Sequence, residues 1–297
     1  MSRWSEPLES AYRACEALAR SHYENFPVAS RLLPASMRPH VAAVYAFARV
    51  ADDMADEGAG GPAERQARLR AWKERLHEAV AGGDERRKPS SDDRLFVAIA
   101  HSIRSLDLPI SLFDDLVSAF DQDTTTTRYR SWRDVLDYCR RSANPIGRLV
   151  LRIAGYRDEA LDRSSDALCT ALQLTNFWQD FGRDWRADRL YVPRDISDAC
   201  GAREADLAGD ALPSEWARAI DACVDRTAVL FAEGRPVCDG VRGRLKLELR
   251  MTWLGGRRIL ERVHAGRAEL VHSRPTLRAG DLPILLWRAA SWGRVAA

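Results

Sequence analysis

The chain has 297 residues, of which 46% are hydrophobic and 30% charged, a composition typical of a globular protein. Its formal net charge of +2 is too small to indicate a nucleic-acid partner, and its six cysteines, without CxxC spacing, fit a reducing compartment better than a disulfide or metal framework. The N-terminus lacks the apolar core of a signal peptide, and no apolar run reaches the ~20 residues of a membrane span. These features predict a cytoplasmic protein.

Apolar residues recur with helical spacing along almost the whole chain, and no convincing alternating strand pattern occurs. The predicted helices are residues 7–24, 38–57, 62–82, 93–106, 109–122, 131–143, 145–155, 158–186, 213–233, 239–265 and 281–292. The polar segments 83–92, 123–130 and 197–212 are predicted loops. No flexible linker divides the chain, so the sequence predicts an all-α protein with one domain over residues 1–297.

The last predicted helix, DLPILLWRAASW at residues 281–292, is the most apolar segment of the chain. It is too short to cross a membrane, but it is long enough to lie on a membrane surface. A last helix packed on the protein core is the favoured interpretation. Peripheral membrane contact is the alternative.

A first acidic motif lies in YAFARVADDMADE, residues 45–57. On a helix, Arg49, Asp52 and Asp56 fall at i, i+3 and i+7 and share one face, among apolar neighbours. Aspartate is unfavourable within a helix, and burying two like charges is costly unless a cation joins them. The pattern therefore favours a face that binds a divalent metal.

A second acidic motif is QLTNFWQDFGRDW, residues 173–185. Gln173, Asn176, Asp180 and Asp184 fall at i, i+3, i+7 and i+11, which is one stripe along a single helix. Amide and carboxylate oxygens are the ligands that Mg²⁺ prefers. Carboxylates so close raise each other's pKa, unless Mg²⁺ and an anionic diphosphate are bound with them. Three following arginines are candidates for the remaining phosphate charge: Arg183, Arg186 and Arg189.

Either acidic motif alone is usually a solvated helix face. Two of them, each in phase with further polar residues and each in apolar surroundings, favour a functional site over that alternative. Aromatic side chains beside the motifs, Tyr45 and Phe177 among them, are candidates for the wall of a substrate pocket.

Four segments carry a resemblance to a known family: SRLLP, YAFARVADDMADE, YCRRSANPIGRLV and QLTNFWQDFGRDWRADRLYVP. In their order and spacing the chain resembles the squalene/phytoene synthase family from about residue 18 to residue 292. The resemblance implies an isoprenoid-synthase helical bundle with a central cavity flanked by two aspartate-rich helices. It also implies Mg²⁺-dependent chemistry, with two or three ions, on farnesyl-type or presqualene diphosphates.

The resemblance assigns roles to individual residues. It implies metal binding by Asp52, Asp56, Asn176, Asp180 and Asp184. It implies substrate contacts by Tyr45, Arg49 and Gln173.

Some positions depart from the usual family pattern. Gln179 precedes Asp180 where relatives usually have arginine. Arg141 stands where squalene synthases commonly have a tyrosine that helps to make presqualene diphosphate, so we count Arg141 among the candidate substrate-binding residues. These departures put ordinary squalene synthesis in doubt.

The segments ENFPVAS, CRRSANPIGR, NFWQD and the C-terminal SRPTL and LLWRA are similar to one branch of the family, the hydroxysqualene synthases of bacterial hopanoid pathways. That similarity implies conversion of presqualene diphosphate and water into hydroxysqualene and pyrophosphate, without NADPH. Functional coupling to upstream and downstream enzymes of squalene metabolism follows from such a reaction.

Asn25 and Asn144 are absent from the usual family pattern and are our candidates for holding the reacting water. Pro145 lacks an N–H and is expected to disturb its helix and expose a carbonyl group. A plain helix boundary at Asn144–Pro145 is the equal alternative. Two other functions stay open: condensation of two farnesyl or geranylgeranyl diphosphates to presqualene diphosphate, squalene or phytoene, and a catalytically silent scaffold.

Overall fold

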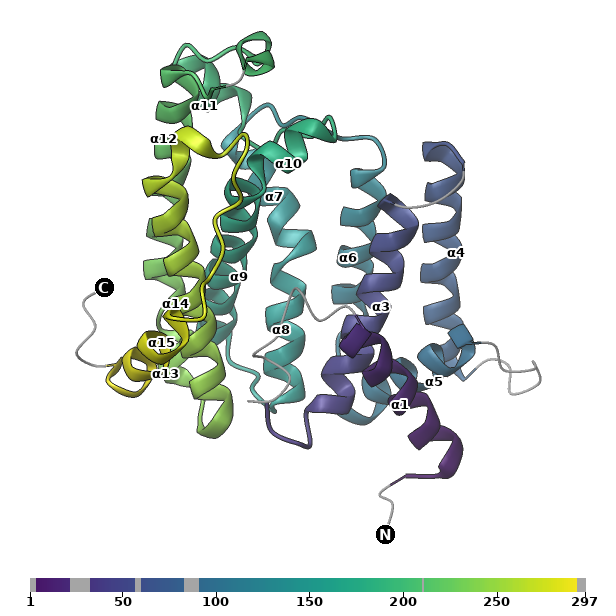
Figure 1. The fold of residues 1–297 in the computed structure, drawn as a ribbon. Helices are drawn as coiled ribbons and strands as arrows, with labels where there is room; N and C mark the ends of the chain where they lie inside the picture. The colour runs from purple at the N-terminus through teal and green to yellow at the C-terminus, as the bar shows by residue number, and fades with distance from the viewer. Residues whose placement is uncertain (1–3, 22–32, 57–59, 83–90, 210, 293–297) are drawn as a thin grey trace. The chain divides into compact units, whose positions relative to one another are not determined.

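The computed structural model describes residues 4–21, 33–56, 60–82, 91–209 and 211–292, and Asn25 lies outside these ranges. The predicted all-α class is confirmed (Figure 1): within the described ranges, extended backbone pairs only at an isolated bridge between Arg128 and Leu190. The chain forms two compact units. Unit 1 comprises residues 1–125 and 145–158, and unit 2 comprises residues 126–144 and 159–297. The single domain over residues 1–297 stays a prediction.

Unit 1 is built around one central helix, α3. Its helices are α1 (Glu6–Ser21), α3 (Arg38–Asp56), α4 (Pro62–Ala81), α5 (Ser91–Leu106), α6 (Ile110–Asp123) and most of α8 (Asn144–Ile153). Helix α3 packs against α1, α4, α5 and α6. Phe47 of α3 is fully buried, with ring centroids 5.7 Å from Trp72 and 5.5 Å from Phe113. Because these contacts surround α3 on several sides, its remaining polar face is held in a fixed orientation.

A buried polar cluster fixes the start of α3. The Tyr12 hydroxyl of α1 is 3.1 Å from His40 Nδ1, 2.8 Å from His101 Nδ1 and 2.8 Å from Ser102 Oγ. Burial raises the pKa of Tyr12 to about 12. Buried polar groups that find partners make packing specific, so this cluster sets the register of α3 against α1 and α5.

Unit 2 is built around α9. Its helices are α7 (Trp132–Ser142), α9 (Glu159–Gln179), α10 (Phe181–Arg186), α11 (Arg194–Ala199), α12 (Ser214–Gly234), α13 (Val237–Gly240), α14 (Gly243–Ala265) and α15 (Asp281–Ala290), with 3₁₀ turns η1 (Glu204–Ala208) and η2 (Arg267–Glu269). Helix α9 packs against α7, α12, α13 and α14. A Cβ atom at Gly234 would lie 2.6 Å from the backbone N of Leu168, so α12 approaches α9 as closely as it does because it has no side chain there.

Three sequence predictions need correction in unit 2. The helix predicted over 158–186 is two helices, α9 and α10, and the helix predicted over 239–265 is interrupted at Val241, where the backbone is extended. The segment 197–212 contains the end of α11 and the turn η1 rather than only loop. Short helices of this kind are stabilised by tertiary contacts that periodicity does not reveal.

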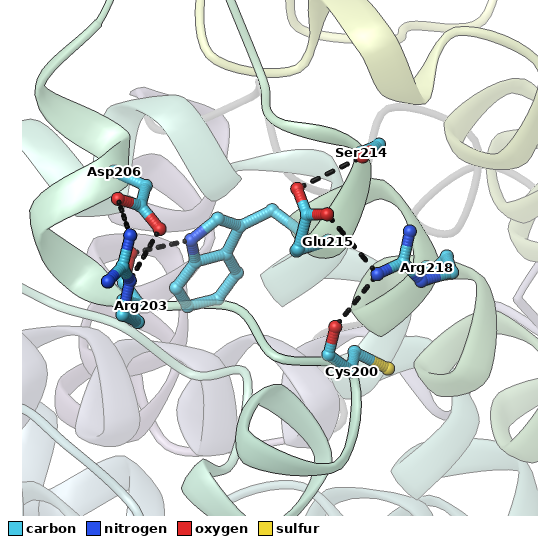
Figure 2. Close-up of polar contacts among 7 residues, drawn as sticks. Cys200, Arg203, Asp206, Ser214, Glu215 and Arg218 are labelled. Atoms are coloured by element: carbon cyan, nitrogen blue, oxygen red, sulfur yellow. Dashed lines mark hydrogen bonds and ion pairs between the residues drawn. The ribbon is translucent and has the colours of Figure 1, made fainter.

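Polar contacts hold the segment that follows α11 (Figure 2). The guanidinium of Arg218 donates to the carbonyl of Cys200 at 2.9 Å, and Arg203 pairs with Asp206 at 3.1 Å. The indole N–H of the fully buried Trp216 donates to the carbonyl of Arg203 at 3.0 Å. The segment is thereby ordered on α12.

No disulfide joins any of the six cysteines, all of which lie in the described ranges. In the described parts of the chain, no helix combines the length and the apolar character that a membrane crossing requires.

Candidate active site

Each unit presents one acidic face, and each face carries the aspartates that the sequence singled out. The α3 face consists of Arg49, Asp52, Asp53 and Asp56 in unit 1. The acid stripe consists of Gln173, Asn176, Asp180 and Asp184 in unit 2.

On the α3 face, the arginine lies among the carboxylates of its own helix. Arg49 Nη1 is 3.5 Å from Asp52 Oδ2, and its Nη2 is 2.6 Å from Asp53 Oδ1. The two carboxylates are 38% and 35% exposed, and Asp56, the last residue of α3, is exposed. Since the pairs have i, i+3 and i, i+4 spacing, α3 alone determines them.

Two polar atoms beside these carboxylates are buried without a hydrogen-bond partner in the described residues. They are the Tyr45 hydroxyl and Nε of Arg49. Burial raises the pKa of Tyr45, against the charge of Arg49, and Asp53 and Asp52 raise it further. An unpaired buried donor costs about 1–3 kcal/mol, so these two donors are suited to an oxygen-rich ligand. Substrate binding by Tyr45 and Arg49 stays a prediction.

The acid stripe crosses a junction between two helices. Helix α9 ends at Gln179, and Asp180, with φ −93° and ψ 9°, precedes the first residue of α10. Hydrogen bonds of helical spacing continue across the junction: the Asp180 N–H donates to the Asn176 carbonyl and the Asp184 N–H to the Asp180 carbonyl, both at 2.9 Å. The four residues of the stripe therefore keep their helical spacing, although the prediction of a single helix is wrong.

Asp180 of the stripe is more enclosed than the carboxylates of the α3 face, although Asn176 is exposed. The side chain of Asp180 is 13% exposed, and Asn176 Nδ2 donates to its Oδ2 at 2.5 Å. Burial raises the pKa of Asp184 to about 7, Asp180 adds to this, and Arg189, Arg183 and Arg274 oppose it. Without a bound cation, Asp184 is therefore only partly ionised at neutral pH.

A segment distant in sequence lies against the stripe. We call residues 270–276 the strap. Its Arg274 pairs with both carboxylate oxygens of Asp180, with Nη2 at 3.2 Å from Oδ2. Sequence reasoning missed Arg274 because it lies 94 residues from Asp180 and in no acidic motif.

Three further contacts attach the strap to the α9–α10 junction. Gln179 Nε2 donates to the Pro275 carbonyl at 2.6 Å, and Arg186 Nη1 donates to the Val271 carbonyl at 2.7 Å. A Cβ atom at Gly182 would lie 2.2 Å from that same carbonyl oxygen, so only glycine allows this approach. Gln179, a departure from the family pattern, thus has a structural role, and Arg186 uses one guanidinium nitrogen to hold the strap.

Phe177 belongs to a cluster of aromatic side chains in unit 2. Its ring stacks on Tyr191 with centroids 3.7 Å apart and lies 6.0 Å from Tyr138. Tyr129 contacts both of these tyrosines, at 5.9 and 5.8 Å. Phe177 is only 5% exposed, so the cluster is a packed aromatic group in the interior of unit 2, on the same helix as the stripe. The tyrosines were missed, although Tyr138 opens the quoted YCRRSANPIGRLV segment.

Three other predicted substrate contacts lie in unit 2. Gln173 is half-buried one turn before Asn176 on α9. The Arg189 N–H donates to the Asp184 carbonyl at 2.8 Å. Arg141 Nη2 pairs with Asp137 Oδ2 at 3.1 Å on α7; burial acts to raise the pKa of Asp137, but Arg140 and Arg141 outweigh it and lower that pKa. Arg141 is therefore engaged within its own helix.

Asn144 lies at a helix boundary, the alternative that the sequence left open. Helix α7 ends at Ser142 and α8 begins at Asn144, whose Oδ1 accepts a 2.9 Å hydrogen bond from the buried Thr170 hydroxyl. The expectation that Pro145 disturbs its helix is wrong. As the second residue of α8 it occupies the first turn, where no backbone N–H is needed.

The oxygen atoms of the two acidic faces can be compared with the ligands that Mg²⁺ prefers. Among the described residues no three His, Cys, Asp or Glu side chains gather into a metal site. Each face supplies two predicted carboxylates, and the stripe adds the amide of Asn176. These are hard oxygen ligands, and the raised pKa of Asp184 identifies a position where a bound cation would relieve a charge penalty, so the residues fit Mg²⁺.

The fold defines the class of protein. A squalene synthase from Alicyclobacillus acidocaldarius superposes with a TM-score of 0.81 and is 40% identical, over 88% of this chain and 96% of that one. The chain is thus an all-α enzyme of the squalene synthase type.

The family follows from sequence. The profile of the squalene/phytoene synthase family matches residues 19–281, and the chain belongs to that family. It is 33% identical to a hydroxysqualene synthase of Rhodopseudomonas palustris over 85% of this chain and 84% of the relative. It is 35% identical to a phytoene synthase of Mycobacterium tuberculosis over 66% of this chain and 62% of the relative.

Proposed function

We propose that the protein converts presqualene diphosphate and water into hydroxysqualene and pyrophosphate, without NADPH. The observation that carries the proposal is the acid stripe, where the half-buried carboxylate of Asp184, with a pKa of about 7, lies near a second carboxylate that is hydrogen-bonded to an amide. The R. palustris hydroxysqualene synthase, matched over most of both chains, supports the choice of reaction.

In this proposal Asp52, Asp56, Asn176, Asp180 and Asp184 are the ligands of two or three Mg²⁺ ions. Bound Mg²⁺ stabilises the charge of the departing pyrophosphate. Tyr45 and Arg49 present their unpaired donors to the same anion, and Gln173, Arg141 and Arg189 are further proposed contacts. The aromatic group around Phe177 excludes bulk water from the carbocation.

The water that ends the reaction needs a hydrogen-bond acceptor that binds its O–H group and so orients its oxygen. Asn144 Oδ1 accepts from Thr170 and keeps a second lone pair, which we propose holds this water. Asn25 is the second proposed water contact and lies outside the described residues.

The substitution Asn144→Ala tests this role, and Thr170→Val is its matched control, because it removes the same hydrogen bond but keeps the amide. We expect Asn144→Ala to lower the fraction of hydroxysqualene among the products about tenfold, whereas Thr170→Val keeps the product and loses thermal stability. An unchanged product distribution in Asn144→Ala removes Asn144 from the proposed water site.

Condensation of two prenyl diphosphates is the second candidate, because the M. tuberculosis phytoene synthase has comparable identity over a shorter span. Purified protein incubated with Mg²⁺ and either presqualene diphosphate or farnesyl diphosphate, with and without NADPH, separates the two. We expect hydroxysqualene from presqualene diphosphate alone, independent of NADPH. Presqualene diphosphate formed from farnesyl diphosphate would establish condensation instead.

The apolar product implies hand-over to a following enzyme or to a membrane. A cytoplasmic location with peripheral membrane contact, and coupling to enzymes before and after it, therefore belong to this proposal.

A further inference from the structure

The C-terminal segment gathers most of the exposed apolar side chains of the described residues. Seven large hydrophobic side chains are exposed in the described residues as a whole, and five of them lie between positions 277 and 287. They are Leu277, Leu282, Ile284, Leu286 and Trp287, with exposures of 44%, 47%, 53%, 44% and 68%. Single exposed apolar residues are ordinary, but a contiguous group of this kind indicates an interaction surface.

Helix α15 is apolar on the side that faces away from the protein. Its buried residues Asp281, Leu285 and Ala289 have i, i+4 spacing and cover about a third of the helix circumference. The rest of the helix, apart from Arg288 at its edge, carries only Leu282, Pro283, Ile284, Leu286, Trp287 and Ala290. A surface helix of a globular protein normally places polar residues there, so this outward α15 face is unlike an ordinary solvated face.

The helix is fixed to unit 2 at both ends. At its start, the buried Asp281 carboxylate is 2.9 Å from Arg262 and 3.4 Å from Arg258. After its end, the Trp292 indole N–H donates to Asp239 at 3.1 Å, and the Arg235 guanidinium lies 4.9 Å from the Trp292 ring centroid. The exposed apolar side is therefore a built feature of the fold, because α15 cannot turn it inward without losing these contacts.

Within the segment that carries the α15 face, the exposed charged side chains are arginines. Asp281 is the only acidic residue after Glu269 in the sequence, and it is buried and paired with arginines. Arg278 and Arg288 flank the apolar residues and make no ion pair within the described ranges. A face with apolar side chains, a tryptophan and flanking cations complements an anionic lipid surface.

The size of the α15 face argues against a second copy of the chain. Side chains of this size carry on the order of 200 Å² each, so five that are about half exposed offer on the order of 500 Å². A stable protein–protein interface buries roughly 800 Å² on each partner. A lipid bilayer has no such requirement, since a single short amphipathic helix is enough for reversible binding.

We propose that the α15 face, with Leu277 beside it, docks the protein on an anionic lipid bilayer, with Trp287 and Leu286 inserted at the acyl boundary and Arg278 and Arg288 on the headgroups. This deepens the membrane contact included in the proposed function but does not rest on the reaction, because binding is measured without substrate.

The test is co-sedimentation of the full chain with phosphatidylcholine vesicles and with vesicles that also contain phosphatidylglycerol. We expect binding to the anionic vesicles and at least tenfold weaker binding by the double variant Leu286→Ser/Trp287→Ser. The matched control Val97→Ser/Val229→Ser removes two exposed apolar side chains elsewhere and should bind like the wild type. Arg278→Gln/Arg288→Gln should weaken binding to the anionic vesicles, and added salt should reduce the difference from wild type.

All replaced residues are exposed or at the edge of the helix, and circular dichroism verifies folding. Equal vesicle binding by Leu286→Ser/Trp287→Ser and wild type would overturn the proposal. So would the absence of vesicle binding together with a concentration-dependent dimer, seen by sedimentation velocity, that this variant abolishes.

Discussion

Asp52 on α3 and Asp180 at the α9–α10 junction both have an arginine counter-ion, but the arginines come from very different places in the sequence. Arg49 is three residues from Asp52 on the same helix, whereas Arg274 is 94 residues from Asp180. The α3 carboxylates are about a third exposed, and Asp180 is 13% exposed. Water stabilises the charge of the exposed α3 carboxylates, so an arginine of the same helix is a sufficient counter-ion. The enclosed carboxylate of Asp180 is less well hydrated and depends on an arginine that the tertiary fold brings to it.

The largest expected effect tests whether both faces serve one reaction. We expect Asp52→Asn and Asp180→Asn each to lower turnover about a thousandfold, or ~4 kcal/mol, because each removes a proposed metal ligand. Mg²⁺-dependent product formation from presqualene diphosphate is the measurement. Glu78→Gln on α4 in unit 1 and Asp198→Asn in unit 2, both at exposed positions, are the matched controls. Full activity in Asp52→Asn would show that the α3 face has no catalytic part.

The next effect concerns stability and pH at the stripe. The pKa of Asp184 is raised to about 7 from 3.8, so its ionisation destabilises the folded state increasingly between about pH 4 and 7. In the presence of a chelator, Asp184→Asn should be more stable than wild type by on the order of 2 kcal/mol at pH 8, and this gain should vanish below about pH 4.

Denaturant unfolding across this pH range measures the difference in free energy of unfolding between Asp184→Asn and the wild type. Addition of Mg²⁺ should stabilise the wild type at pH 8 and so reduce this difference. A gain of equal size at pH 4 and pH 8 would mean that the substitution acts through packing rather than through the charge of Asp184.

The counter-ions provide a direct comparison of the faces. Removing Arg274 leaves the enclosed Asp180 without its ion pair, and we expect Arg274→Gln to cost about 1–2 kcal/mol in metal-free protein at pH 8. Arg49→Gln should cost less, under about 1 kcal/mol, because water reaches Asp52 and Asp53. Chemical denaturation of both variants under the same conditions is the measurement, and equal costs would remove the distinction drawn between the faces.

The smallest effect concerns the strap. Gln179→Ala removes one hydrogen bond to the Pro275 carbonyl and should cost about 0.5–1 kcal/mol. Hydrogen exchange should increase within residues 270–276 and leave the α3 face unchanged. Gln173→Ala is the control on the same helix, for which we expect weaker substrate binding but no change in the strap. Unaltered exchange in Gln179→Ala would show that Arg274 and Arg186 hold the strap without the Gln179 hydrogen bond.

Much of the site could be predicted because its spacing lies within single helices. The i, i+3, i+7 positions of Arg49, Asp52 and Asp56 fix their common side as soon as α3 forms. The stripe was also predicted in phase, because helical hydrogen bonds persist across Asp180 even though the helix is divided there. The prediction of one continuous helix over 158–186 was wrong, because a junction held by tertiary contacts leaves the apolar period of the sequence unchanged.

Arg274, Gly182 and the stacked tyrosines could not be predicted from periodicity. Each acts through a partner in another element of the fold, and helical periodicity does not show which elements meet. The role of Gln179 belongs here too: its departure from the family pattern was visible, but its partner at Pro275 was not.

The sequence by itself determined the all-α class, the family and the identity of the acidic residues, because helix period and short-range spacing are local properties. Only the tertiary structure decided how strongly each acid is perturbed and which arginine neutralises it, because desolvation and long-range ion pairing depend on the packed neighbours. The same division holds for the last helix. Its apolar composition was plain in the sequence, whereas the fold decided that Leu285 and Ala289 face the core and Leu286 and Trp287 face outward.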